Sequence, residues 1–292
     1  MTHNGKRVAL VTGASRGAGA GIARGLGELG YTVYVTGRTT VPGDAKGWDG
    51  TVLPGTVTET AAAVTERGGE GIPVVCDHAD DAQVARLFAQ IMDEQGRLDV
   101  LVNNATYIHH QLIEKMPFWE KDLDAQKILD VGLRSAYVAS WHAARIMVPQ
   151  GSGIIAMTSS FGATCYMHGP AYGAQKAGLD KLAHDMEHDL RGTGVVAVSL
   201  WLGMQVTERS QISAKTHPEQ YEELLAMAEN PEFSGHVIDA IDRAPNREAL
   251  SGETLIVAEI ARELGVQDRG NDRISFRNTL GSPRAKNPAA VY

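Results

Sequence analysis

Short apolar runs alternate with longer stretches of helical periodicity along most of this sequence. The runs are apolar throughout rather than at every second residue, which is typical of strands that are buried on both faces. Because strand, helix and strand in repetition form parallel βαβ units, the order predicts a parallel sheet covered by helices on both faces. We expect strands at residues 7–12, 32–37, 73–76, 100–102, 154–157, 195–200 and 255–258, and helices at 17–30, 82–94, 119–148 and 171–190.

The chain length allows one large domain: 292 residues suffice for a single α/β domain with a well-buried core. We therefore predict one Rossmann-type, doubly wound domain over residues 1–292, with about seven strands. Residues 40–55 are rich in glycine and proline and indicate an inserted loop. Residues 203–249 have helical pieces without a strand signal and are expected to cap the active cleft. The polar tail, residues 268–292, is expected either to be partly disordered or to wrap onto another subunit.

Composition excludes several classes of function. The formal net charge of -8 argues against a nucleic-acid-binding surface, which needs clustered lysine and arginine. No apolar run is long enough to span a bilayer, and the first one is too short for a signal peptide. With only two cysteines, Cys76 and Cys165, no disulfide framework is expected. These features predict a reduced, cytoplasmic setting.

A glycine-rich turn follows the first strand. Gly13, Gly17 and Gly19 stand where the strand should end and the helix begin, with Ser15 and Arg16 between them. Glycine lets the backbone approach a pyrophosphate closely, and the helix N-terminus offers free N–H donors. The turn therefore predicts a dinucleotide site, although a purely structural turn is the alternative.

The end of the second strand indicates which dinucleotide is preferred. NAD-binding sites place an acidic residue there for the ribose 2′-hydroxyl, whereas this chain has Arg38 and no acid. Arg38, helped by Arg16, could hold a 2′-phosphate, so NADP(H) is favoured over NAD(H). The alternative is that both arginines are solvated surface residues.

Two further strand ends carry candidate cofactor contacts. Asp77 ends the third strand, where it could accept hydrogen bonds from the adenine amino group or instead cap the next turn. Asn104 and Ala105 follow the fourth strand, at the edge where α/β sheets bind ligands, although asparagines are also ordinary turn formers.

Tyr172 and Lys176 stand four residues apart on a predicted helix and should project to the same side. A free tyrosine has a pKa near ~10, and a nearby ammonium would lower it enough for acid–base catalysis. Ser159, at the end of the fifth strand, can donate a hydrogen bond to a substrate oxygen. These three residues predict proton transfer to a carbonyl oxygen, coupled to hydride transfer from the dinucleotide.

These motifs together resemble the short-chain dehydrogenase/reductase family over nearly the whole chain. The resemblance implies NADPH-linked interconversion of a carbonyl and a secondary alcohol, often of a lipophilic molecule. It assigns Thr207 to the nicotinamide carboxamide, and its spacing selects Ser159 over the adjacent Ser160, which is otherwise a turn residue. It also implies a homodimer or homotetramer formed through the two long helices.

The sequence departs from the family at three positions. Gly132 stands where the family often has a catalytic asparagine that anchors a water chain to the lysine, and Asp130 is two residues away. Leu202 replaces the usual proline before Gly203, and Thr106 replaces a glycine. The alternative functions are a non-catalytic NADP(H) sensor, which Gly132 slightly favours, and a reductase of enoyl thioester C=C bonds.

Other reactive residues are interpreted as secondary. His184 and His188 have zinc-like spacing, but a solvated helix face explains them. His109-His110 could contact substrate from the loop after the fourth strand, and no metal site is expected there. Cys165 is either an apolar lining residue or a reactive thiol. The following residues indicate either an apolar substrate pocket or simply core: Phe161, Tyr166, Met167 and Met204.

Overall fold

The computed structural model describes residues 5–47, 49–287 and 289–291. Its centre is a parallel sheet of seven strands in the order β5-β2-β1-β6-β7-β8-β9, which confirms the predicted fold class. The order reverses direction at β1, so the sheet is wound both ways from that strand. The strands are β1 (Val8–Val11), β2 (Thr32–Gly37), β5 (Glu70–Val75), β6 (Val100–Asn103), β7 (Gly153–Ser159), β8 (Val195–Trp201) and β9 (Thr254–Ile256).

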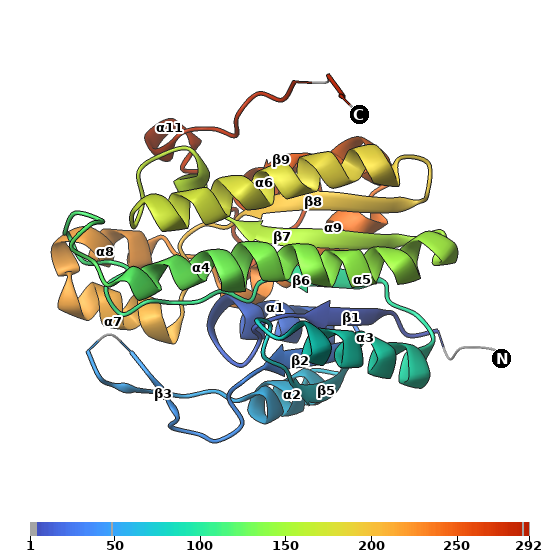
Figure 1. Cartoon of the computed structure of the whole chain (residues 1–292), viewed down its shortest axis with the longest axis horizontal. Coiled ribbons are helices and arrows are strands. Elements are labelled where there is room, and N and C mark those ends of the chain that lie inside the picture. The colour runs from blue at the N-terminus through green and yellow to red at the C-terminus, as the bar shows by residue number, and fades with distance from the viewer. Residues whose placement is uncertain (1–4, 48, 288, 292) are drawn as a thin grey trace.

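Helices cover both faces of the sheet, and on one of these faces α5 and α6 run side by side along the strands (Figure 1). Within β1, Ala9 and Val11 join one buried apolar cluster, whereas Val8 and Leu10 join the other. This explains why the strands are apolar throughout. One layer contains α1 (Gly17–Glu28), α2 (Val57–Glu66), α9 (Pro231–Arg243) and α10 (Val257–Glu263), and the other α3 (Asp81–Gln95), α5 (Ser135–Gln150) and α6 (Pro170–Leu190).

Several strand boundaries differ from the prediction, and those of β5 and β9 are the most informative. The strand expected at 73–76 is β5, which begins at Glu70 and contains Pro73. Proline is tolerated there because β5 is an edge strand, where one side of the backbone needs no ladder partner. The last strand ends at Ile256, and α10 begins at the next residue, so the expected strand at 255–258 is too long.

The long helix expected at 119–148 is wrong in its first half. A 3-10 turn (Leu123–Gln126) leads into the short α4 (Lys127–Leu129), and a widened turn (Asp130–Arg134) separates α4 from α5. Inside that turn Val131 has an extended ψ of 90° and Gly132 has a φ of 149°. Since L side chains rarely adopt such a φ, Gly132 makes this break possible.

The stretches outside the βα alternation have structure of their own. The inserted loop 40–55, of which residue 48 is not described, contains an antiparallel pair, β3 (Ala45–Lys46) and β4 (Val52–Leu53). Within 203–249, α7 (Glu208–Thr216) and α8 (Pro218–Ala226) lie beyond the carboxyl ends of the strands (Figure 1), whereas α9 belongs to a helical layer. The candidate cap is therefore α7 and α8.

The C-terminal tail folds back onto the domain. It forms the short α11 (Arg277–Leu280), and Phe276 and Leu280 pack against a buried cluster that contains Phe161 and Trp201. Residues 288 and 292 of the predicted tail lie outside the described residues. Among the helices that the structure describes, none has both the length and the apolarity needed to cross a bilayer.

Candidate active site

Tyr172 and Lys176 are brought together on α6. Gly169 precedes the helix and Pro170 occupies its first turn, which sets Tyr172 at the helix start, beside the carboxyl end of β7. The Lys176 Nζ lies 5.4 Å from the centre of the Tyr172 ring and donates a hydrogen bond of 3.0 Å to the carbonyl oxygen of Thr158. The lysine thus bridges from the helix to the end of β7, and its side chain is buried.

The serine whose hydroxyl contacts the tyrosine is Ser160, whereas the catalytic role predicted for Ser159 stays a prediction. The hydroxyls of Ser160 and Tyr172 are 2.9 Å apart. Ser159 is 2% exposed, and its hydroxyl donates to the carbonyl oxygen of Lys176 at 3.2 Å. Because adjacent side chains of extended backbone point to opposite sides, only one of the two serines can face the tyrosine.

Burial dominates the protonation of this pair. It raises the pKa of the Tyr172 hydroxyl, an effect that the hydrogen bond from Ser160 opposes. Burial also lowers the pKa of Lys176 to about 8, against the opposing charge of Asp180. The expectation that the lysine ammonium lowers the pKa of the tyrosine is therefore not met, because desolvation disfavours the charged form of both groups.

A partly buried carboxylate lies one turn after the lysine. Asp180 accepts hydrogen bonds from the Ser199 hydroxyl at 2.6 Å and from the Trp201 indole N–H at 3.0 Å. Burial raises its pKa, and these two donors oppose the rise. Asp180 thereby ties α6 to β8 and holds the helix that carries Lys176 in position.

Ser160 and Tyr172 lie in the wall of a large cavity. It has a volume of about 1200 Å³ and is lined mainly by apolar side chains from the loop after β6, from α8 and from the tail. Phe161, Tyr166, Met167 and Met204, which the sequence suggested as pocket residues, all line it. Cys165 instead packs against the cluster that contains Phe161 and Trp201. The tail residues Ile274, Phe276, Thr279 and Leu280 also contribute to the wall.

His168 packs edge-on against the Tyr172 ring, with the ring centres 5.0 Å apart. Its backbone is in the left-handed region, at a φ of 59°, which is uncommon for a residue other than glycine. Burial lowers the pKa of His168 to about 4, so the imidazole is neutral near pH 7. The strained backbone thus presents this ring to the Tyr172 ring.

The glycine turn packs tightly against the end of β6. A Cβ at Gly13 would lie 2.6 Å from the Ala105 Cα, and a Cβ at Gly19 would lie 2.3 Å from the Asn104 Nδ2. The Asn104 amide donates to the carbonyl oxygens of Thr12 and Gly13 at 2.8 and 3.0 Å. Asn104 and Ala105 therefore shape the turn.

The N-terminus of α1 has the features of an anion site. Gly17 has a φ of 59°, and the N-cap residue Arg16 makes no side-chain capping bond to the helix. The first-turn N–H groups thus point toward the loop that follows β8. Glu208, the first residue of α7, accepts a hydrogen bond from the Gly17 N–H at 3.3 Å, and the N-cap residue Thr207 lies close by, 3.9 Å from where a Gly17 Cβ would be.

The predicted 2′-phosphate contacts differ in their surroundings. The Arg38 side chain is 67% exposed at the end of β2, and its nearest acidic partner is Asp77, at 3.9 Å. Arg16 is engaged instead by the inserted loop, donating to the carbonyl oxygens of Pro54 and Gly55. The Asp77 carboxylate accepts the Ala79 N–H at 3.0 Å, so it caps the following turn. Ser15 is buried within the glycine turn.

A glutamine occupies the space beside Gly132. A Cβ on Gly132 would lie 2.3 Å from the Gln175 Nε2, and that amide donates to the Thr106 hydroxyl at 3.2 Å. Gln175 is 1% exposed, and within the described residues its Oε1 has no hydrogen-bond partner. The departures at Gly132 and Thr106 are thus structurally linked through Gln175.

Sequence reasoning missed several residues of this site. Ser160 was set aside as a turn residue, and Asp180, His168 and Gln175 were not considered. Asp180 lies four residues after Lys176, a helical spacing that could have indicated it. The strained backbone of His168 and the position of Gln175 beside Gly132 had no sequence signal.

Comparison with known proteins now decides the family. The family model described as short chain dehydrogenase matches residues 7–217. This chain belongs to the short-chain dehydrogenase family. It is 40% identical over 274 residues to dehydrogenase/reductase SDR family member 1 of Homo sapiens, covering 90% of this chain and 83% of that protein. It is 28% identical over 230 residues to a 3beta-hydroxysteroid dehydrogenase of Mediterraneibacter gnavus, covering 77% and 76% of the two chains.

Solved structures agree on the fold of this short-chain dehydrogenase. A putative dehydrogenase from Xanthomonas campestris superposes with a TM-score of 0.76 at 23% identity, covering 94% of this chain and 95% of that one. A putative gluconate dehydrogenase from Agrobacterium tumefaciens has a TM-score of 0.71 at 26% identity, covering 86% and 93%. As a member of this family, the chain is an oxidoreductase that uses NAD(P)(H) and a small-molecule substrate.

The residues of this short-chain dehydrogenase fit such a cofactor. The left-handed Gly17 and the tight contact of Gly13 with Ala105 leave a backbone cradle that side chains would fill. The N-terminus of α1 can receive the pyrophosphate.

Proposed function

We propose that this protein is an NADP(H)-dependent oxidoreductase that interconverts a carbonyl group and a secondary alcohol, most favourably on a lipophilic molecule. The observation that carries this proposal is the hydroxyl pair of Ser160 and Tyr172, 2.9 Å apart, in the wall of an apolar cavity. Two converging hydroxyls are suited to one carbonyl oxygen, because both can donate to it as negative charge develops.

The chain's own residues divide the chemistry as follows. When bound, the cofactor supplies or accepts the hydride. Tyr172 gives its proton to the substrate oxygen during reduction and takes it back during oxidation. Ser160 orients that oxygen and stabilises its charge. Lys176, held by the Thr158 carbonyl at 3.0 Å, has its Nζ 5.4 Å from the centre of the tyrosine ring and would hold the nicotinamide ribose.

The proposed preference for NADP(H), which carries a 2′-phosphate, depends on the residue that follows β2. Arg38 stands there without a neighbouring acid on the same strand, and a guanidinium suits a phosphate better than a ribose hydroxyl. Its exposure leaves the side chain free to turn toward a bound phosphate. Gly13, Ser15, Gly17 and Gly19 would hold the pyrophosphate, with Asp77 near the adenine and Thr207 at the carboxamide.

A lipophilic substrate is supported by the cavity wall. Its lining comes mainly from apolar side chains, including Leu112, Met167, Leu224 and Phe276. Burying such surface against an apolar substrate is favourable by roughly 25 cal/mol per Å². Relatives named for steroid and alkaloid-like ketones, such as 3beta-hydroxysteroid dehydrogenase and tropinone reductase-like 2, support the same class.

We also propose that subunits pair through α5 and α6. Tyr137 and Trp141 are 53% and 49% exposed one turn apart on α5, with Val148 further along the same helix. Three exposed apolar residues on one surface helix favour burial against a second copy. Trp141→Glu should then shift the protein to monomer in light-scattering measurements. The cytoplasmic location stays a prediction.

A screen of NADPH consumption tests the function. Purified protein is mixed with NADPH and a panel of steroid, aryl and small aliphatic ketones, and absorbance loss is followed. We expect turnover of the larger apolar ketones, with NADPH preferred over NADH. Tight cofactor binding without turnover of any ketone or alcohol would favour a dinucleotide sensor instead. Turnover of enoyl thioesters alone would favour the C=C reductase.

A further inference from the structure

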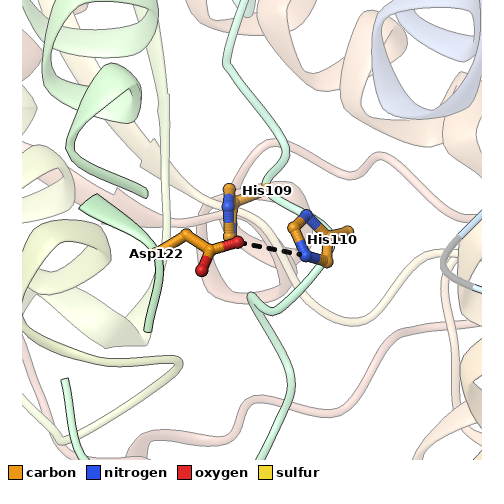
Figure 2. A group of neighbouring side chains, drawn as sticks. All are labelled: His109, His110 and Asp122. Carbon is orange, nitrogen blue, oxygen red and sulfur yellow. Dashed lines mark ion pairs between the residues drawn. The ribbon is translucent and has the colours of Figure 1, made fainter. Parts of the chain in front are cut away.

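Two histidines and a carboxylate meet in the loop after β6. His109, His110 and Asp122 each offer one ligand atom, and these atoms lie within 4.8 Å of one another (Figure 2). The His110 Nε2 lies 3.5 Å from an Asp122 carboxylate oxygen. We propose that this triad binds one divalent transition-metal ion of the Zn²⁺ type, and the proposal does not depend on the oxidoreductase function.

The donor set selects the class of ion. Two imidazole nitrogens and one carboxylate oxygen suit Zn²⁺ and its neighbours, whereas Mg²⁺ and Ca²⁺ prefer oxygen ligands alone. Three protein ligands leave a fourth position for water. Bond lengths of about 2.0–2.1 Å require ligand atoms roughly 3.4 Å apart in a tetrahedral site, so the triad must close by about an ångström. His110 and Asp122 can make this movement because their side chains are 64% and 61% exposed.

The surrounding loop already holds the three residues near one another. The Asp122 N–H donates to the Gln111 side-chain carbonyl at 2.8 Å, and the Gln111 N–H donates to the His109 Nδ1 at 3.2 Å. Ligation through either ring nitrogen of His109 gives up that second bond. A metal bound at Nδ1 takes the lone pair that accepts the Gln111 N–H. A metal bound at Nε2 requires the ring proton to sit on Nδ1, which then no longer accepts that hydrogen bond. Metal binding therefore costs the 3.2 Å hydrogen bond from Gln111 and gives the buried His109 imidazole a bond to the metal in its place.

An ion at this place would join the two ends of a segment of the cavity wall. Leu112, Ile113, Met116 and Pro117 lie between the ligands in sequence and line the large cavity. His109 and Asp122 also line a smaller cavity of about 310 Å³ that extends to Tyr172. The ion would therefore stiffen the wall that faces the candidate active site. This departs from the expectation from sequence, because nothing local indicated that Asp122 folds back onto the histidines.

Zn²⁺ titration of the full chain, with any polyhistidine tag removed, tests the proposal. Isothermal titration should show one tight site, and Mg²⁺ should show none. His110→Ala and Asp122→Asn remove exposed side chains, and each should weaken Zn²⁺ binding at least tenfold. The matched control is His184→Ala combined with His188→Ala, which removes a helical histidine pair and should leave binding unchanged.

Three results would overturn the site: no Zn²⁺ binding to the wild-type chain, unchanged binding in both triad variants, or loss of binding in the α6 control. Circular dichroism of each metal-free variant verifies that the fold is intact. Because the readout is binding rather than turnover, failure of the metal site is distinguishable from failure of the proposed reaction.

Discussion

The Ser160 hydroxyl lies 2.9 Å from the Tyr172 hydroxyl, whereas the neighbouring Ser159 hydroxyl faces the carbonyl oxygen of Lys176. The two serines therefore have separate tasks. One contacts the candidate proton donor at the cavity, and the other fastens β7 to α6. This difference can be measured, because each hydroxyl can be removed alone.

Ser160→Ala should lower kcat/KM by about 10²–10³-fold, the loss typical of one oxyanion donor. Ser159→Ala should instead lower the free energy of unfolding by about 1 kcal/mol, the net value of one hydrogen bond, and leave kcat/KM within about tenfold. Steady-state kinetics and denaturant unfolding of both variants check this. The reverse outcome would restore Ser159 as the catalytic serine.

Arg38→Ala should separate the two cofactors. Loss of charged hydrogen bonds to a 2′-phosphate, at about 1.5–3 kcal/mol, should weaken NADPH binding roughly 10–100-fold. NADH lacks that phosphate and serves as the internal control, so its Kd should change less than about threefold. Equal weakening of both cofactors, measured by fluorescence titration, would remove the NADP(H) assignment.

Lys176 should make stability rise with pH above neutrality. Its pKa in the folded chain is lowered to about 8 from 10.5, so between those values the unfolded chain binds more protons. The penalty for burying the ammonium is complete below pH 8 and is relieved as pH rises toward 10.5. Relative to Lys176→Met, the wild type should gain about 2 kcal/mol between pH 7 and 9.5. Urea unfolding at both pH values checks the slope, and parallel curves would refute the shifted pKa.

Gly132→Ala should destabilise the break between α4 and α5. The added Cβ would lie 2.3 Å from the Gln175 Nε2, at a φ of 149°. Overpacking and backbone strain each cost about 1–3 kcal/mol. Gln175→Ala removes the partner of the collision but not the backbone strain. Gly132→Ala should therefore lower the free energy of unfolding less in the Gln175→Ala background than in the wild-type chain. No measurable effect in thermal unfolding would mean that the turn tolerates a side chain.

The sheet could be predicted because its strands are buried on both faces, so their apolar runs needed no periodicity to be recognised. Residue counting did less well at the site. The spacing to Tyr172 selects Ser159, but a shift of one residue in extended backbone reverses the direction of the side chain, and the hydroxyl beside Tyr172 is that of Ser160. Chain order alone cannot decide which of two neighbouring serines faces the cleft.

Long-range contacts explain the other failures. Apolar helical periodicity continues across Gly132, so the break at that residue could not be read locally. Phe276 and Leu280 are isolated apolar residues in a polar tail, and their docking beside Phe161 has no sequence signal. Asp122 approaches His110 only after the intervening loop has folded.

The most direct test of the account is Tyr172→Phe, measured for both turnover and cofactor binding. The substitution removes the proton donor and leaves the ring that packs against His168 and Lys176. A positioned acid–base group typically contributes about 10²–10⁴-fold to the rate. We predict that NADPH-dependent ketone reduction falls by at least about 10³-fold, while the Kd for NADPH changes less than about threefold. A variant that keeps full activity would contradict the mechanism.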